Sequence, residues 1–154
     1  MSDLRDLYQQ QILDHNKQPR NFRRMADPSG QAEGHNRSCG DQLTVFLKLR
    51  ENVIEDISFD GKGCAISKAS ASMMTAALKG KSVEEVHAIF ESFHEMVASE
   101  EELEEAELEE LGKLAVFSGV RAYPSRVKCA SLAWHTMHAA LENDGAHTAP
   151  VSTE

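Results

Sequence analysis

The sequence lacks the features that mark membrane and secreted proteins. No apolar run approaches the ~20 residues that a membrane-spanning helix needs. The N-terminal residues are charged from the third position onward and contain no apolar core, so they do not read as a signal peptide. From these absences we expect a cytoplasmic protein that has no membrane as a partner.

Basic residues are also scarce. The chain has 16 Lys and Arg against 25 Asp and Glu, which gives a net charge of −9. Nucleic-acid-binding proteins usually carry a basic patch, and the sequence shows none, so nucleic acid is not an expected partner. Much of the negative charge lies in residues 99–111, which hold eight glutamates and no basic residue. The sequence assigns this segment no role beyond a solvated surface.

Cysteine is limited to three residues in 154. An odd number in a chain expected to be cytoplasmic argues against a disulfide framework. It leaves metal binding, reactive-thiol chemistry or simple burial. A domain of this length buries about two thirds of its unfolded surface, so it does not need a metal merely to fold. A metal site in this chain would therefore point to function more than to structural support.

The apolar patterns predict an α+β fold. Apolar residues at period two over residues 42–50 and 53–60 predict two strands of a hairpin, with a short edge strand near 31–36. Helices are expected at 3–15, 64–78, 82–96, 114–120 and 126–142. The predicted fold is a small antiparallel sheet of about three strands with helices packed on one side. We expect a single domain over residues 1–142 and a disordered polar tail over residues 143–154.

All three cysteines fall where an expected element begins. Cys39 lies in a turn just before a strand, Cys64 opens a helix after two glycines, and Cys129 lies in the first turn of the last helix. Inert core cysteines have no reason to gather at such positions. A helix N-terminus, in contrast, stabilises a thiolate that binds a metal or reacts. The set is therefore a candidate functional site.

The Cys39-Gly40-Asp41 segment adds a carboxylate to the set. In an extended backbone, residues two apart point to the same side, so Cys39 and Asp41 can face one ion. If Cys64 and Cys129 converge on them, the four side chains form an S₃O donor set. Zinc accepts such ligands in four-coordinate sites, and three thiolates favour zinc or iron–sulfur species over magnesium or calcium. The spacing alone supports a metal site or a reactive-thiol site.

Three segments resemble the signature segments of a known family. They read R-S-C-G-D at 37–41, G-K-G-C-A-I-S-K-A-S-A-S-M-M at 61–74 and R-V-K-C-A-S-L-A-W at 126–134. They are similar to the segments of U-type iron–sulfur cluster assembly proteins, the IscU/NifU N-terminal family, and the likeness covers about residues 3–142. The resemblance implies the IscU/NifU fold and a metal site made of Cys39, Asp41, Cys64 and Cys129.

Three departures place the resemblance in the SufU branch of that family. IscU-type scaffolds carry a ligand histidine directly before the third cysteine, where this chain has Lys128. The double proline of IscU is replaced by Tyr123-Pro124-Ser125, and the stretch between Cys64 and Cys129 is longer. The resemblance to SufU implies a Zn²⁺ site and sulfur transfer from a partner cysteine desulfurase of the SufS type.

Two functions remain open at this point. In one, the chain is a sulfurtransferase-type acceptor in which Cys39, on the most mobile segment, takes persulfide sulfur and passes it to downstream iron–sulfur scaffold proteins. In the other, the chain is a non-enzymatic scaffold on which a [2Fe–2S] cluster is built and handed on. The same thiols serve both functions, and Lys128 favours the first.

The histidines are not expected to bind metal. His87 and His94 belong to a helix without cysteine, which predicts a helix-surface position. His135 and His138 have no acidic or thiol neighbour in their segment, so packing and helix surface are the favoured interpretation. His35 precedes Cys39 by four residues, but the four-ligand set is complete without it.

Overall fold

The computed structural model describes residues 2–99, 103–142 and 151–152. The elements in chain order are α1 (Ser2–Lys17), β1 (Gly30–Asn36), β2 (Asp41–Arg50), β3 (Val53–Lys62), α2 (Ala65–Leu78), α3 (Val83–Ala98), α4 (Glu105–Leu111), the 3₁₀ helix η1 (Gly112–Ala122), α5 (Pro124–Glu142) and β4 (Val151–Ser152). Among these described helices, none is long and apolar enough to span a membrane.

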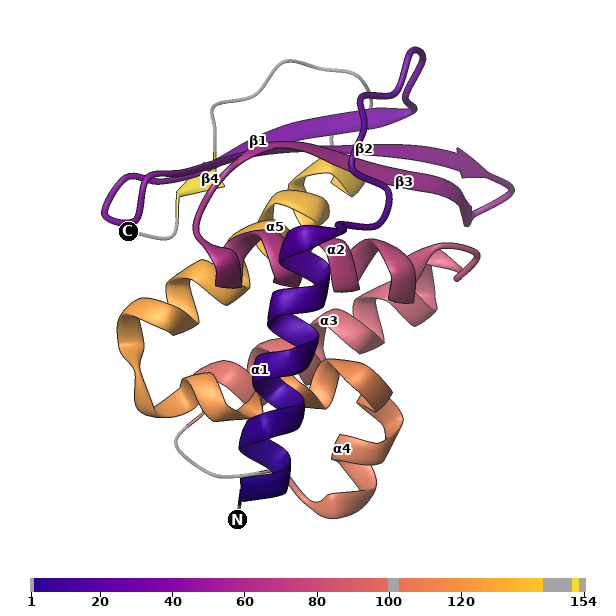
Figure 1. Ribbon diagram of the computed structural model, residues 1–154. Coiled ribbons are helices and arrows are strands. Elements are labelled where there is room, and N and C mark those ends of the chain that lie inside the picture. Colours follow the sequence, from indigo (N-terminus) through magenta and orange to yellow (C-terminus); the bar gives the residue numbers. More distant parts are fainter. Residues whose placement is uncertain (1, 100–102, 143–150, 153–154) are drawn as a thin grey trace.

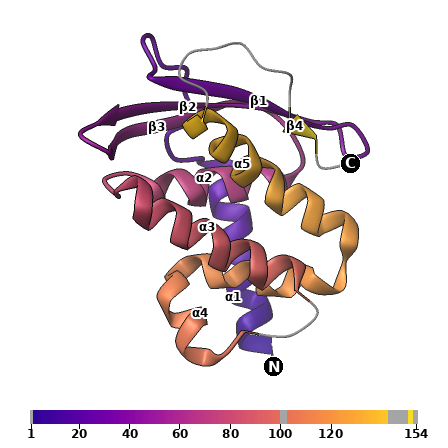
Figure 2. The same cartoon turned by 180° about the vertical axis from the view of Figure 1, so that it is seen from behind.

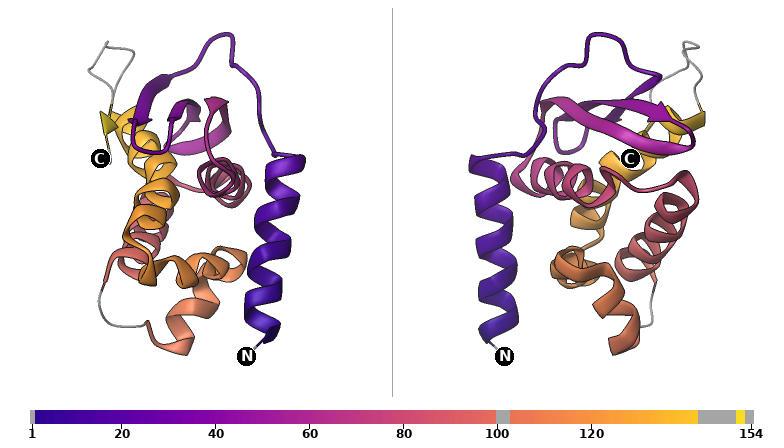
Figure 3. Two further views of the ribbon diagram at one scale, coloured as in Figure 1. Left: turned by 60° about the vertical axis from the view of Figure 1, so that its left-hand side comes forward. Right: turned by 90° about the vertical axis from the view of Figure 1, so that its right-hand side faces the viewer.

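The sheet has the strand order β3-β2-β1-β4, with β1, β2 and β3 antiparallel to one another. Figure 1 shows the sheet at one end of the molecule, and the two views of Figure 3 show the helices gathered on one of its faces. The predicted α+β architecture, a small antiparallel sheet with helices on one side, is confirmed.

The predicted tail over residues 143–154 contains a short strand. Val151–Ser152 form β4, which pairs in parallel with Gly34 and His35 of β1. Two residues carry too little pattern to reveal a strand from sequence. The other residues of that segment lie outside the described part of the chain.

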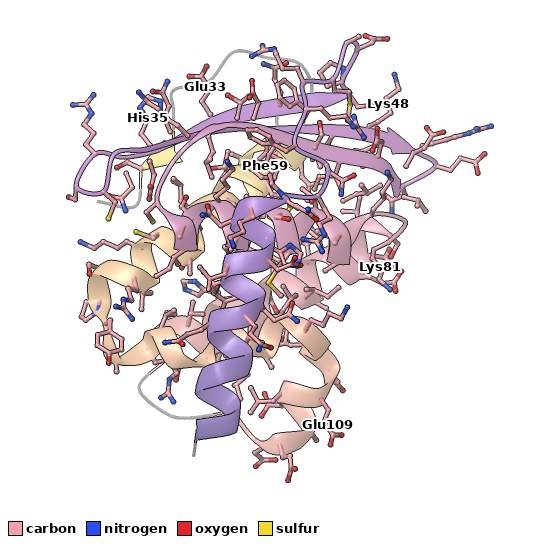
Figure 4. The ribbon with its side chains drawn as sticks, viewed as in Figure 1. Glu33, His35, Lys48, Phe59, Lys81 and Glu109 are labelled. Carbon is pink, nitrogen blue, oxygen red and sulfur yellow. The ribbon has the colours of Figure 1, made fainter. Side chains whose placement is uncertain are left out.

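Alternation along the strands separates the two faces of the sheet. Val45 pairs with Phe59 and both are fully buried, whereas Glu33 and Lys48 lie on the opposite face. Figure 4 shows Phe59 between the sheet and the helices, and Glu33 and Lys48 on the far side of the sheet. The apolar face of the hairpin therefore packs against the helices and closes one side of the core.

One predicted helix has a different form. We expected a helix at residues 114–120, and the chain forms the longer 3₁₀ helix η1 over 112–122. Its buried residues Leu114, Phe117 and Val120 are spaced three apart. That spacing places them on one face of a helix with three residues per turn, so the 3₁₀ form buries all three against the core.

A buried serine joins the two helices that carry cysteines. The Ser70 hydroxyl of α2 donates a hydrogen bond to the carbonyl oxygen of Ala130 in α5 at 2.6 Å. The Ser70 Oγ in turn accepts a hydrogen bond from the Trp134 indole nitrogen at 3.2 Å. All three residues are fully buried. This contact fixes α2 against α5 and thereby fixes the distance between Cys64 and Cys129.

We expect Ser70→Ala to destabilise the fold by about 1–3 kcal/mol, because it leaves a buried carbonyl and a buried indole N–H without a partner. Urea unfolding followed by tryptophan fluorescence measures the change. The matched control is Ser92→Ala on α3, where the serine is only half-buried. Equal stability of the Ser70→Ala and Ser92→Ala variants would contradict the role of the Ser70 contact.

Candidate metal centre

Three segments distant in sequence meet at one end of the sheet. The β1–β2 turn supplies Cys39 and Asp41, and α5 supplies Cys129. The Cys129 Sγ lies 3.0 Å from the Cys39 Sγ, and the donor atoms of Cys39, Asp41 and Cys129 all lie within 4.8 Å of one another. The structure thus brings together three of the four side chains that the sequence suggested as ligands.

The turn that carries Cys39 is closed by the sheet itself. Asn36 and Asp41 are the last paired residues of β1 and β2, and the Cys39 amide donates to the carbonyl of Asn36 at 3.3 Å. Gly40 has φ +72°, a left-handed conformation that glycine adopts without strain. As a result Asp41 is buried at 2% exposure, while Cys39 stays exposed.

Cys64 joins the group through Asp41. The Asp41 Oδ1 accepts a hydrogen bond from the Cys64 amide at 2.7 Å, and its Oδ2 lies 3.9 Å from the Cys64 Sγ. The approach depends on Gly63, because a Cβ at that position would lie 2.8 Å from Asp41 Oδ1. The fourth predicted ligand therefore stands beside the group of three, held there by a buried carboxylate.

The thiols of Cys64 and Cys129 differ in pKa. Cys64 is the N-cap of α2, where its Sγ accepts a hydrogen bond from the Ser67 amide at 3.4 Å. A hydrogen bond from the Cys129 thiol, helped by the Ser67 amide, lowers the pKa of Cys64 to about 7 against the opposing effect of burial. The same interaction, together with burial and the contact with Cys39, raises the pKa of the Cys129 thiol. Cys64 is therefore the first of this pair to become a thiolate.

The surroundings suit a soft or borderline cation. The Asn36 amide nitrogen lies 3.8 Å from the Cys129 Sγ and orients that sulfur. The Asn36 Oδ1 and the Ser67 Oγ are buried without a hydrogen-bond partner among the described residues. Three thiols and one buried carboxylate form the donor set that zinc accepts. The residues present therefore fit a four-coordinate zinc ion.

Two supporting residues were missed from sequence. Asn36 lies in the predicted edge strand near residues 31–36, and its place in the sequence gives no sign that it is fully buried against Cys129. Gly63 is one of two glycines before Cys64 in the sequence, and its lack of a side chain is what admits the Asp41 carboxylate to the start of α2. The signal that could have identified Asn36 is its pairing with Asp41, which lies directly opposite it across the β1–β2 turn.

His35 lies apart from the group. Neighbouring residues of a strand point to opposite faces, so His35 faces away from the side on which Asn36 is buried. Its Nε2 is 4.0 Å from Glu33 Oε2, and Figure 4 shows both side chains on the sheet face away from the helices.

Two basic residues lie near Cys129 at the start of α5. Lys128 is exposed next to Cys129, and the Arg126 guanidinium stacks 4.4 Å from the ring centre of Tyr123.

Comparison with known proteins places this arrangement in a family. The model of the NifU-like N-terminal domain matches residues 7–143. The chain belongs to the NifU-like N-terminal domain family. This membership confirms the resemblance on which the sequence prediction was based.

Relatives of this NifU-like chain carry names from iron–sulfur cluster assembly. It is 39% identical over 92% of its length, and 87% of the relative's, to an iron–sulfur cluster assembly scaffold protein IscU of Streptococcus pyogenes serotype M1. It is 38% identical to the zinc-dependent sulfurtransferase SufU of Bacillus subtilis, over 88% of this chain and 90% of that one.

A solved structure shows the same fold. The chain superposes with a TM-score of 0.79 and 33% identity on an iron–sulfur cluster assembly scaffold protein of the SUF system from Fervidobacterium islandicum, covering 88% of this chain and 96% of that one. The family assignment therefore rests on sequence and on three-dimensional structure together.

We expect Gly63→Ala to weaken zinc binding about 10–100-fold, the usual effect of disturbing a group that orients a ligand. The added Cβ would displace the Asp41 carboxylate from the Cys64 amide. Competition with a chromophoric chelator measures the affinity. Gly119→Ala is the matched control, because a Cβ there meets nothing within 4 Å. Equal affinity in the two variants would contradict the role of Gly63.

Proposed function

We propose that this chain is a zinc-dependent sulfur acceptor that takes persulfide sulfur from a cysteine desulfurase during iron–sulfur cluster assembly. One observation carries the proposal. Cys39 is exposed, yet its Sγ lies 3.0 Å from the buried Cys129 Sγ and within 4.8 Å of a donor oxygen of the buried Asp41. Such a thiol can belong to a metal site and still meet the sulfur of another protein.

The four side chains have separate tasks in this proposal. Cys64, Cys129 and Asp41 are held by α2, α5 and the end of the sheet, and they form the fixed part of the site. Cys39 sits in the four-residue turn between β1 and β2, outside the paired residues of the sheet. A bound Zn²⁺ would keep the thiols deprotonated and mask them from oxidation. Movement of this turn would release the Cys39 thiol from the metal and expose it to the partner protein.

The transfer step is a thiol–persulfide exchange. The Cys39 thiolate attacks the outer sulfur of a persulfide on the desulfurase cysteine, so a new S–S bond forms at Cys39 while the S–S bond of the donor breaks. The desulfurase cysteine leaves as a thiolate, and the persulfide proton stays with the transferred sulfur. No external oxidant or reductant is needed. The same exchange in the next step would deliver the sulfur to a downstream iron–sulfur scaffold protein.

The comparisons support a desulfurase of the SufS type as partner. The B. subtilis relative is named a zinc-dependent sulfurtransferase, and Lys128 stands next to Cys129 where IscU-type scaffolds carry a ligand histidine. A lysine ammonium has no lone pair for a metal at neutral pH. The side chain at this position therefore favours a sulfur acceptor over a cluster scaffold.

We expect Cys39→Ser to abolish both sulfur loading of this chain and its stimulation of the desulfurase, because the accepting thiol is removed. Zinc should still bind, with lower affinity, through the three remaining donors. Mass spectrometry of the chain after incubation with desulfurase and cysteine detects the added sulfur, and elemental analysis detects the zinc. Ser38→Ala in the same turn is the control. If Cys39→Ser lost zinc but kept the stimulation, the acceptor assignment would be wrong.

A second candidate function is a [2Fe–2S] scaffold, since relatives from S. pyogenes and Thermotoga maritima are named IscU scaffolds. In this function the cluster is cargo held by the same thiols.

The residue at position 128 distinguishes the sulfur acceptor from the cluster scaffold. We expect Lys128→His to retain more cluster absorbance than the unchanged chain after anaerobic reconstitution and chelator treatment, because it supplies an imidazole ligand. Equal, chelator-stable absorbance in the unchanged chain would favour the scaffold function.

A further inference from the structure

A cavity lies where α1 packs against α2 and η1. Its volume is about 360 Å³, within the range of roughly 300–1,000 Å³ that is usual for small-molecule pockets. Helix α1 stands in front of the other helices in Figure 1 and behind them in Figure 2. Met73, in the cavity lining, lies nine residues after Cys64 and so about 13.5 Å further along α2. The cavity is therefore separate from the thiol centre.

The lining of the cavity combines an apolar surface with a polar set that only donates hydrogen bonds. The apolar residues come from α2, α4 and η1 and are Met73, Ala76, Ala77, Leu111 and Leu114. The polar residues are His15 of α1, Arg20 and Lys113. Among the described residues that line the cavity, none carries a carboxylate. A ligand with an apolar body and an acceptor group at one end matches this division.

The hydrogen bonds of Ser72 determine where the His15 ring carries its proton. The Ser72 Oγ accepts a hydrogen bond from the Arg20 amide at 2.8 Å and lies 2.7 Å from the His15 Nδ1. A hydroxyl has one proton to donate, and within the described residues Nδ1 is the acceptor that the Ser72 hydroxyl meets. With Nδ1 as an acceptor, the neutral imidazole carries its proton on Nε2.

The Nε2 donor of His15 is left for a ligand. His15 is 7% exposed and lines the cavity, and its printed hydrogen bond within the described part of the chain uses Nδ1 alone. Burial, followed by the charge of Arg20, lowers the pKa of His15, so the ring is neutral at pH 7. A buried donor without a partner is costly, and an acceptor placed in the cavity would remove that cost.

The charges around the cavity match a single negative charge. The Arg20 guanidinium is paired with the Asp14 carboxylate at 2.7 Å, so these two charges largely offset each other. Lys113 is exposed and makes no ion pair with any of the described residues. The positive charges of Arg20 and Lys113 both act on His15 and help to lower its pKa. About one unit of positive charge thus remains beside the buried donor.

We propose that this cavity binds a small monocarboxylate with an apolar body, such as a short-chain fatty acid. The carboxylate accepts a hydrogen bond from the His15 Nε2 and faces the Lys113 ammonium, and the hydrocarbon lies against Met73 and Leu114. An amino acid fits less well, because no acidic side chain among the described lining residues would meet its ammonium group. The site does not depend on sulfur transfer at the thiol centre.

The first test is a titration of the full chain with hexanoate, followed in long-range ¹H–¹⁵N spectra of the histidine rings. We expect a saturable shift of the His15 Nε2, while the ring of His94, exposed on α3, stays unchanged. Acetate should bind at least ~10-fold more weakly, since each buried methylene is worth about four-fold in affinity. Hexanol should also bind at least ~10-fold more weakly, because it lacks the charged acceptor. No saturable shift at His15, or equal binding of hexanol, would overturn the proposal.

Variants at the cavity supply the second test. Ala76→Leu adds bulk at an exposed lining position and should weaken hexanoate binding at least ~5-fold, the lower end of the cost of overfilling a site. The matched control is Ala98→Leu, at an exposed position of α3 that does not line the cavity. Equal affinity in the Ala76→Leu and Ala98→Leu variants would place hexanoate elsewhere and refute the proposal.

The charge at the cavity is tested in the same way. Lys113→Gln should weaken hexanoate binding about 2–5-fold, the worth of a partly exposed ion pair. Lys62→Gln, at an exposed position of β3 outside the cavity, should leave the affinity unchanged. Neither variant should change hexanol binding, since hexanol carries no charge. Equal effects of Lys113→Gln and Lys62→Gln on hexanoate would contradict the assignment of the carboxylate to this cavity.

Discussion

The structure of the thiol centre depends on one hydrogen bond, from the Cys64 amide to the Asp41 carboxylate at 2.7 Å. It connects the end of the β1–β2 hairpin to the start of α2. Residues from two segments that are distant in sequence therefore lie side by side in the thiol centre. Asp41 is 2% exposed, and a buried carboxylate without such a donor would be costly. The hairpin, the glycine before Cys64 and the first turn of α2 are all arranged so that this contact can form.

The three thiols differ in exposure and in proton affinity, and those differences suit different tasks. Cys39 is exposed, Cys64 is half-buried and Cys129 is buried. The pKa of Cys64 is lowered to about 7 and that of Cys129 is raised, since the two share a proton. A metal ion that replaces this proton would meet a thiolate first at Cys64, while the most accessible sulfur remains at Cys39. In the proposed function, these differences suit Cys64 and Cys129 to retention of the metal and Cys39 to exchange.

Helix α5 links the thiol centre to α3. Its first turns bring Cys129 to the hairpin, and its later turns bring His138 to α3, where the ring centres of His138 and His87 are 5.4 Å apart. The middle of the helix is fixed by the buried contacts of Ser70 and of the Phe93 ring, which stacks 4.3 Å from Trp134. This buried central segment fixes the position of Cys129 relative to the helices packed against α5.

The sequence by itself determined the three antiparallel strands, most helix positions and the α+β class, and it nominated the four side chains of the thiol centre. Period-two and period-3.6 patterns are local, and the signature segments around Cys39, Cys64 and Cys129 are contiguous in the chain. Only the tertiary structure decided how Asn36 and Gly63 support that centre, which thiol loses its proton first, and that His87 meets His138. The reason is physical: periodicity shows which face of a helix is apolar or polar, but the neighbour of that face is set by the packing of the whole core.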